Sequence, residues 1–262
     1  MRRHFQVFRA AARASIEDYI SQPLWPLFLT ITPFAFALVG VVLYKDAPRA
    51  VFALYVILGS GAMGMWSSTL DGAGYSVGYD RIWGTIQYTF ITPASQLWIM
   101  AGRSLIYTAV GLLTLVEILI VTALFFGVQL TIASPLAFLL AALLTFLAFA
   151  VIGLLLGSFF MLTRVAGHWQ NAFSYSLYVF CGVMYPISVL PGWLRPVSYV
   201  LAPTWSLEAI RMSVNSGVLG DPRYLTNLGL TLLLLALYVL LAWYLQRVVE
   251  HRVRVNADLE RM

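Results

Sequence analysis

Long apolar runs separated by short polar stretches dominate the chain. A run of about 20 apolar residues is long enough to cross roughly 30 Å of hydrocarbon as a helix. Such runs occupy 24–44, 51–70, 104–126, 135–162, 171–190 and 226–246. The pattern predicts an all-α integral membrane protein with six transmembrane helices. Because no stretch outside the runs is long enough for a separate soluble domain, residues 1–262 are treated as a single transmembrane domain.

The N-terminal residues 1–22 mix charged and apolar side chains at roughly helical spacing. Arg9 and Arg13 stand there among Phe5, Phe8 and Ile16. This spacing is typical of a helix that lies in the membrane interface, which we expect here. A solvated helical tail is the alternative.

Two connections between the runs are long. Residues 71–103 open with several glycines, and we expect them to form a connection on the cytoplasmic side. Residues 191–225 are too apolar for a free loop, and three prolines prevent one straight helix: Pro191, Pro196 and Pro203. We therefore expect short external helices that dip into the membrane or lie on it, because helices keep their backbone groups hydrogen-bonded in lipid.

The distribution of Lys and Arg predicts the orientation. The N-terminal segment, residues 71–103, residues 163–170 and the C-terminal tail hold 11 basic residues, whereas the other connections hold 5. Basic residues prefer the cytoplasmic side, so both termini are expected in the cytoplasm. Without a source attached, we expect a bacterial or archaeal cell membrane.

Composition supports this class and excludes others. The chain is 61% hydrophobic and 10% charged, whereas soluble domains carry about 25% charged residues. The formal net charge of +5 comes from residues at the ends of the runs and not from a clustered surface, so no nucleic-acid partner is expected. The single cysteine, Cys181, excludes an internal disulfide and a cysteine-based zinc site.

For a membrane protein that acts as a transporter, this residue inventory restricts the source of energy. The chain has one lysine, Lys45, in a short turn, so no phosphate-binding loop of the G-x-x-x-x-G-K-[ST] kind is present. If ATP drives transport, a separate ATPase subunit must bind ATP and Mg²⁺. Glu117 is the ionisable residue deep in a run, and an ion-coupled secondary transporter using Glu117 is the alternative. A structural ion pair or a protonated carboxyl would also explain it.

Enzymatic chemistry finds no support in the sequence. The histidines lie outside the runs, and no H-E-x-x-H motif or G-x-S-x-G nucleophile turn is present. We therefore expect no catalytic, metal-binding or cofactor-binding residues on this chain.

Two segments carry a family resemblance. The first has an acidic-Arg-x-x-Gly-Thr run at Asp80, Arg81, Gly84 and Thr85, followed by Thr92-Pro93-Ala94-Ser95 and the pair Gly102-Arg103. The second follows the fifth run and comprises Gly182, Tyr185-Pro186, Leu190-Pro191, Glu208 and Arg211. Together, in this order, they resemble the type-2 permease family of ATP-binding-cassette exporters. Asp80 stands where Glu is commoner, and Gln87 where an acid often stands.

The resemblance implies the membrane subunit of an ATP-driven exporter, working as a homodimer with two ATPase subunits. It also implies a short cytoplasmic coupling helix that docks on the ATPase. Its candidate coupling residues are Asp80, Arg81, Trp83, Gly84, Thr85 and Gln87. The mixture of apolar and polar side chains in this segment also suits docking on a partner, and it suits equally an interfacial helix touching only lipid headgroups; the resemblance favours docking.

The second and fifth spans are implied to line the pathway. Their side chains combine apolar bulk with hydroxyls and no fixed charge, which favours an amphipathic or lipid-linked cargo such as a drug, glycolipid or polysaccharide. The residue candidates for the pathway or its gate are Ser67, Ser68, Glu117, Tyr175, Tyr178, Tyr185 and Trp193.

Overall fold

The computed structural model describes residues 2–21, 25–46, 48, 51, 53–85, 95–126, 132–163 and 166–256. Every regular element in these ranges is helical, which confirms the all-α class for the described part of the chain. In chain order the elements are α1 (Arg2–Ser21), α2 (Trp25–Leu43), η1 (Ala53–Ile57), α4 (Leu58–Ile82), α6 (Gln96–Phe126), α7 (Pro135–Leu162), α8 (Ala166–Phe180), η2 (Ile187–Val189), α9 (Arg195–Val200), α10 (Ala202–Met212), η3 (Val218–Gly220) and α11 (Pro222–Asn256).

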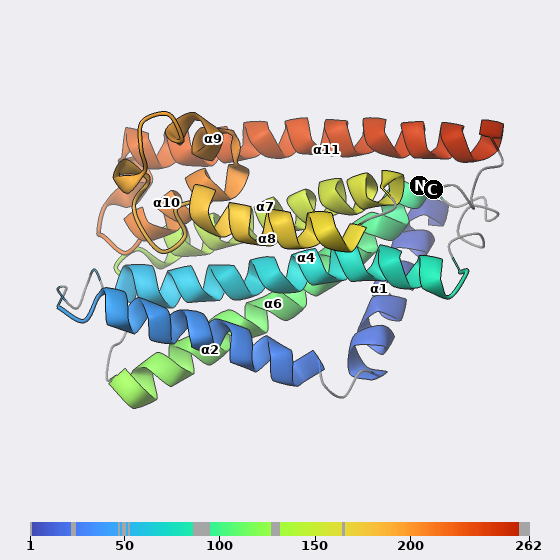
Figure 1. The fold of residues 1–262 in the computed structure, drawn as a ribbon. Coiled ribbons are helices and arrows are strands. Elements are labelled where there is room, and N and C mark those ends of the chain that lie inside the picture. Colours follow the sequence, from blue (N-terminus) through green and yellow to red (C-terminus); the bar gives the residue numbers. More distant parts are fainter. Residues whose placement is uncertain are drawn as a thin grey trace.

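The long helices form one elongated bundle (Figure 1). Helix α1 lies at the end of the bundle where α4 and α11 finish and α6 begins; we call this the α1 end. The short helices α9 and α10 lie at the opposite end, which we call the α10 end. Helix α11 lies along one edge of the bundle beside α7, and α2 lies on the far side against α4.

Most predicted spans coincide with helices. Helix α7 covers the predicted range 135–162, α2 lies within 24–44, and α6 and α11 extend beyond their predicted ranges at the α1 end. Among the described helices, α6, α7 and α11 contain segments long and apolar enough to cross a membrane: Gln96–Leu124, Pro135–Leu162 and Pro222–His251.

Helix α4 is longer than the sequence predicts. The apolar run predicts that the second span ends at residue 70, whereas the helix continues through the first residues of the 71–103 connection to Ile82. The glycines there permit close packing. A Cβ atom on Gly72 would lie 2.0 Å from the ring of Tyr107 in α6, and one on Gly74 would lie 2.2 Å from the side chain of Gln170 in α8.

Helix α8 is shorter than predicted. The run 171–190 does not form one helix, because α8 ends at Phe180. Gly182 follows in the left-handed conformation, with φ +59°, which glycine adopts without steric cost. A short 3-10 turn at Ile187–Val189 comes next. The apolar residues after Phe180 therefore pack as an irregular segment at the α10 end.

Helix α7 packs closely against α4 and α6. A Cβ atom on Gly153 would lie 2.4 Å from Ser104 Oγ and 2.5 Å from Thr69, so the glycine allows the three helices to approach closely. Ser104 donates a hydrogen bond to the Ala150 carbonyl (2.5 Å), and the Thr69 and Thr108 hydroxyls share another (2.8 Å). Such small and hydroxyl-bearing residues are typical of helix contacts in membranes.

Candidate functional site

Two apolar side chains extend from the tip of α4 at the α1 end. Ile82 is 79% exposed and Trp83 is 75% exposed. Gly84, with φ +67°, ends the helix, and its N–H donates to the Arg81 carbonyl (3.1 Å). We call Ile82–Thr85 the α4 tip. Large apolar groups that remain exposed in this way mark surfaces that meet a partner or a membrane. Gln87 lies outside the described residues.

Arg81 fastens the α4 tip to α7. Its guanidinium donates hydrogen bonds to the carbonyls of Phe160 (3.2 Å), Met161 (2.8 Å) and Thr163. The last four carbonyls of a helix have no partner within that helix, and a cation near this end also interacts favourably with the helix dipole. Arg81 therefore caps α7 and holds the tip against it.

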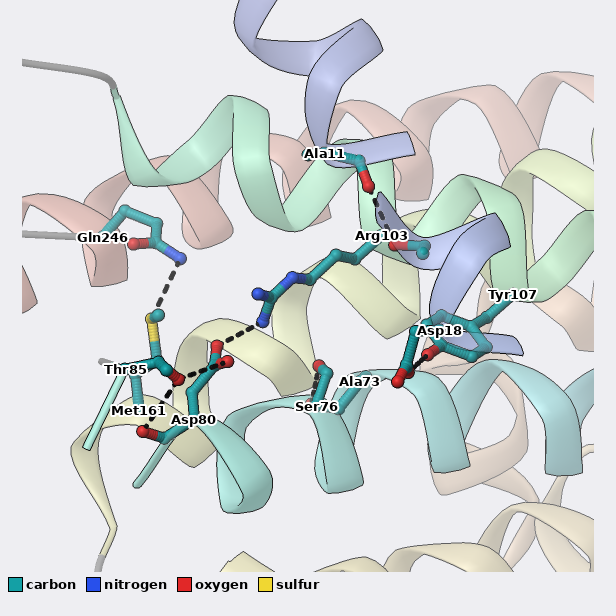
Figure 2. Close-up of polar contacts among 11 residues, drawn as sticks. Ala11, Asp18, Ala73, Ser76, Asp80, Thr85, Arg103, Tyr107, Met161 and Gln246 are labelled. Atoms are coloured by element: carbon teal, nitrogen blue, oxygen red, sulfur yellow. Dashed lines mark hydrogen bonds and ion pairs between the residues drawn. The ribbon is translucent and has the colours of Figure 1, made fainter. Parts of the chain in front are cut away.

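Asp80 fastens the same tip to α6. Its Oδ2 atom lies 2.5 Å from Arg103 Nη1, and the two side chains are only 17% and 19% exposed. The Thr85 hydroxyl donates to Oδ1 of the same carboxylate (3.2 Å). Figure 2 shows Arg103 and Thr85 meeting the Asp80 carboxylate from two sides. Arg103 belongs to the Gly102-Arg103 pair of the motif, but the sequence did not identify it as a site residue.

Helix α1 packs against the same region. The Tyr107 hydroxyl donates to Asp18 Oδ2 (2.8 Å), and a Cβ atom on Gly102 would lie 2.8 Å from the Phe8 carbonyl oxygen. A polar cavity of about 210 Å³ lies between α1, α4 and α6, with Asp18, Asp80, Arg103 and Tyr107 among its lining residues. The N-terminal helix is thus part of the bundle through α6.

A buried arginine organises the α10 end. Arg211 of α10 is 7% exposed, and its Nη2 atom donates to the carbonyls of Gly182 and Val183, both at 2.7 Å. Its guanidinium also lies 4.6 Å from the centre of the Tyr55 ring, a cation–π contact. Arg211 therefore ties the segment after α8 to α10 and η1.

Neighbouring groups extend this contact. Glu208 Oε2 lies 3.4 Å from Arg211. Tyr44 stacks on Tyr55, with ring centres 5.6 Å apart, and its hydroxyl donates to the Met184 carbonyl (2.6 Å). Arg211, Glu208, Tyr55 and Tyr44 thus form one cluster. The sequence motif included Glu208 and Arg211, but only the fold shows that Tyr44 and Tyr55 lie beside them.

The predicted pathway residues do not form one cluster. Ser68 is buried and donates to the Tyr107 carbonyl (2.7 Å), whereas Ser67 lies 3.4 Å from Asp71 Oδ2. Tyr178 is buried against α4, and its hydroxyl lies 3.5 Å from the Met63 carbonyl oxygen. Ser68 therefore joins α4 to α6, and Tyr178 joins α8 to α4, where the Ser67 side chain also contacts it.

Of the other candidates, Tyr175 lies one turn before Tyr178 on α8. Tyr175 on α8 and Trp193 at the α10 end are mostly exposed, and Tyr185 donates to the Val179 carbonyl (2.5 Å). Glu117 lies half-buried on α6. Within the described residues, no group of three or more His, Cys, Asp or Glu side chains is placed to hold a metal ion.

Comparison with known proteins identifies the class. A family model described as ABC-2 type transporter matches residues 6–214. Because this match covers well over half of the chain, the chain belongs to the ABC-2 type transporter family. It is therefore a membrane permease subunit, and its family implies association with an ABC ATPase subunit. A comparison with curated proteins finds no match.

Proposed function

We propose that this chain is the membrane subunit of an ATP-driven exporter that moves an amphipathic or lipid-linked molecule out across the membrane. The observation that carries the proposal is the α4 tip. Its exposed Ile82 and Trp83 are available to a partner, while the adjacent Asp80 and Arg81 are fastened to α6 and α7. Movement of an ATPase subunit bound at the tip would therefore act on three helices together.

The proposed topology has six spans with both termini in the cytoplasm. Helices α2, α6, α7 and α11 provide four spans, η1 with α4 provides the second, and α8 with the segment that follows it provides the fifth. The α1 end, which carries the α4 tip, is then cytoplasmic. Helix α1, with exposed Arg9 and Arg13, would lie at the interface there, where basic residues are favoured.

A contact at the α10 end supports the proposed re-entrant region. The Tyr238 hydroxyl donates to the Val200 carbonyl (2.5 Å). Tyr238 is 16 residues past the first residue of α11, which corresponds to about 24 Å along a helix that rises 1.5 Å per residue. The turn between α9 and α10 therefore lies well inside the length of α11, as short helices that dip into the outer leaflet would.

We further propose that two copies of this chain assemble about a twofold axis with two ATPase subunits. The pathway would run between the copies, lined by the second and fifth spans. On α8, Tyr175 and Asn171 stand beside Val179 on the exposed surface. This mixture of polar and apolar side chains suits an amphipathic cargo better than a small ion. Membership in the ABC-2 family favours this function over ion coupling through Glu117.

Truncation of Trp83 tests the coupling surface. Trp83→Ala leaves the bundle unchanged, because the side chain is mostly exposed. An interface Trp commonly contributes 2 kcal/mol or more to binding, so affinity for the ATPase encoded beside this chain should fall about 30-fold. Co-purification and ATP-driven transport in vesicles measure the loss.

Tyr244→Ala is the matched control, since this aromatic side chain is exposed on a different helix, α11. It should leave both readouts unchanged. Equal behaviour of the two variants would show that the α4 tip is not the coupling surface.

A further inference from the structure

An apolar cavity of about 370 Å³ lies beside α7, between α8 and α11. We call it the α8–α11 hollow. Trp66 of α4, Leu155 of α7, Phe173 of α8 and Tyr238 of α11 line its walls, and Val197 of α9 closes it toward the α10 end. Its volume lies within the range of small-molecule binding sites in proteins.

The chemistry of the hollow excludes polar ligands. None of its lining residues is charged, and three of them carry a polar side-chain atom: Trp66, Ser176 and Tyr238. Each of these already donates to a backbone carbonyl, at 3.3, 2.7 and 2.5 Å respectively. A polar ligand would lose its hydrogen bonds to water without gaining replacements, which is unfavourable. The lining of the hollow therefore suits a hydrocarbon ligand.

The shape of the hollow indicates which hydrocarbon. On α8 the lining extends from Phe173 to Phe180, and seven residues of helix correspond to about 10 Å along its axis. Helix α8 runs along the bundle (Figure 1), so this stretch of the lining runs in the same direction as the long helices. Lipid chains in a bilayer lie along this direction.

From these observations we propose that the α8–α11 hollow binds an acyl chain. The chain would belong either to a resident phospholipid or to the lipid part of a transported molecule. The inference rests on the hollow and on the membrane setting that the family establishes, and it does not require the proposed ATPase coupling.

Photolabelling tests the proposal. The chain and its ATPase would be placed in nanodiscs of phosphatidylethanolamine and phosphatidylglycerol, containing a little phosphatidylcholine with a diazirine in mid-chain. After irradiation, mass spectrometry should find labels concentrated on the lining segments 152–156 and 173–180. Labels spread evenly over the exposed apolar faces of α6 and α11 would overturn the proposal.

Two variants sharpen the test. Ser176→Phe places a ring in the hollow and should lower labelling of these segments about tenfold, because an overfilled site cannot accept the chain. Leu155→Phe narrows the hollow from the α7 side and should also lower labelling of these segments. The control Ala236→Phe adds the same ring at an exposed position of α11 and should leave labelling intact. Unchanged labelling in both filling variants would refute the site.

Turnover distinguishes the two sources of the acyl chain. If the chain belongs to a transported molecule, ATP should lower labelling in the wild type but not in Trp83→Ala. If the acyl chain belongs to a resident phospholipid, ATP should change labelling in neither the wild type nor Trp83→Ala. The hollow is then still an acyl-chain site. An ATP effect that persists in Trp83→Ala, with labelling intact, would count against the coupling surface alone, so the two proposals fail separately.

Discussion

The ion pair between Asp80 and Arg103 should contribute measurably to stability. The Oδ2 and Nη1 atoms lie 2.5 Å apart, and less than a fifth of each side chain is exposed. Exposed ion pairs contribute about 0–1 kcal/mol, whereas removing one member of a fully buried pair costs about 3–5 kcal/mol. For this mostly buried pair we expect Asp80→Asn to lower the free energy of unfolding by about 2 kcal/mol.

A double-mutant cycle isolates the interaction. Asp80→Asn and Arg103→Gln remove the charges while retaining polar side chains of similar shape, and the Asn side chain still offers an acceptor to the Thr85 hydroxyl. The free energy of unfolding would be measured for each single variant and for the double variant by titration with sodium dodecyl sulfate in mixed micelles. Because each single variant leaves the other charge unpaired, the double variant should be destabilised by about 2 kcal/mol less than the sum of the two.

An exposed ion pair on α1 provides the internal control for this test. Arg13 and Glu17 form an exposed pair on α1, with Nε and Oε1 2.9 Å apart, so Glu17→Gln should cost no more than about 0.5 kcal/mol. If the Asp80 and Arg103 effects add within about 0.5 kcal/mol, the pair is not coupled. The α4 tip would then not be held to α6 by this ion pair.

Other predictions concern single positions. Gly72→Ala should lower the free energy of unfolding by about 1–3 kcal/mol, because its Cβ would overlap an α6 side chain; Gly229→Ala, which has open space around it, should not. Gly84→Ala should lower the free energy of unfolding by about 1–2 kcal/mol, because alanine is strained in a left-handed backbone conformation. Gly84→Asn should recover part of this loss, since Asn tolerates that conformation. Titration with sodium dodecyl sulfate measures the free energy of unfolding of all four glycine variants. Arg211→Lys should lower the thermal midpoint in detergent, because an ammonium lacks the planar guanidinium that covers the Tyr55 ring while its Nη2 atom donates to two carbonyls. The exposed Arg223→Lys should leave it unchanged.

Local sequence patterns predicted several parts of this protein well. Helix α7 begins and ends where the sequence predicts, because Pro135 favours a helix start and the apolar run continues without a break to Leu162. The motif around Asp80 and Arg81 identified the family that comparison confirms. These features depend on run length, a breaker residue or a short motif, all of which are readable along the chain.

The tertiary structure decided the features that depend on distant partners. Gly72 and Gly74 look like the start of a loop, but they lie within α4, where side chains of α6 and α8 occupy the space that a Cβ atom would need. The apolar run after Phe180 looks like continuous helix, yet Arg211, about 30 residues later, binds the carbonyls exposed by its break. Apolar run length alone determined that the chain enters the membrane, whereas contacts between remote residues decided where its helices end and which charged side chains hold them together.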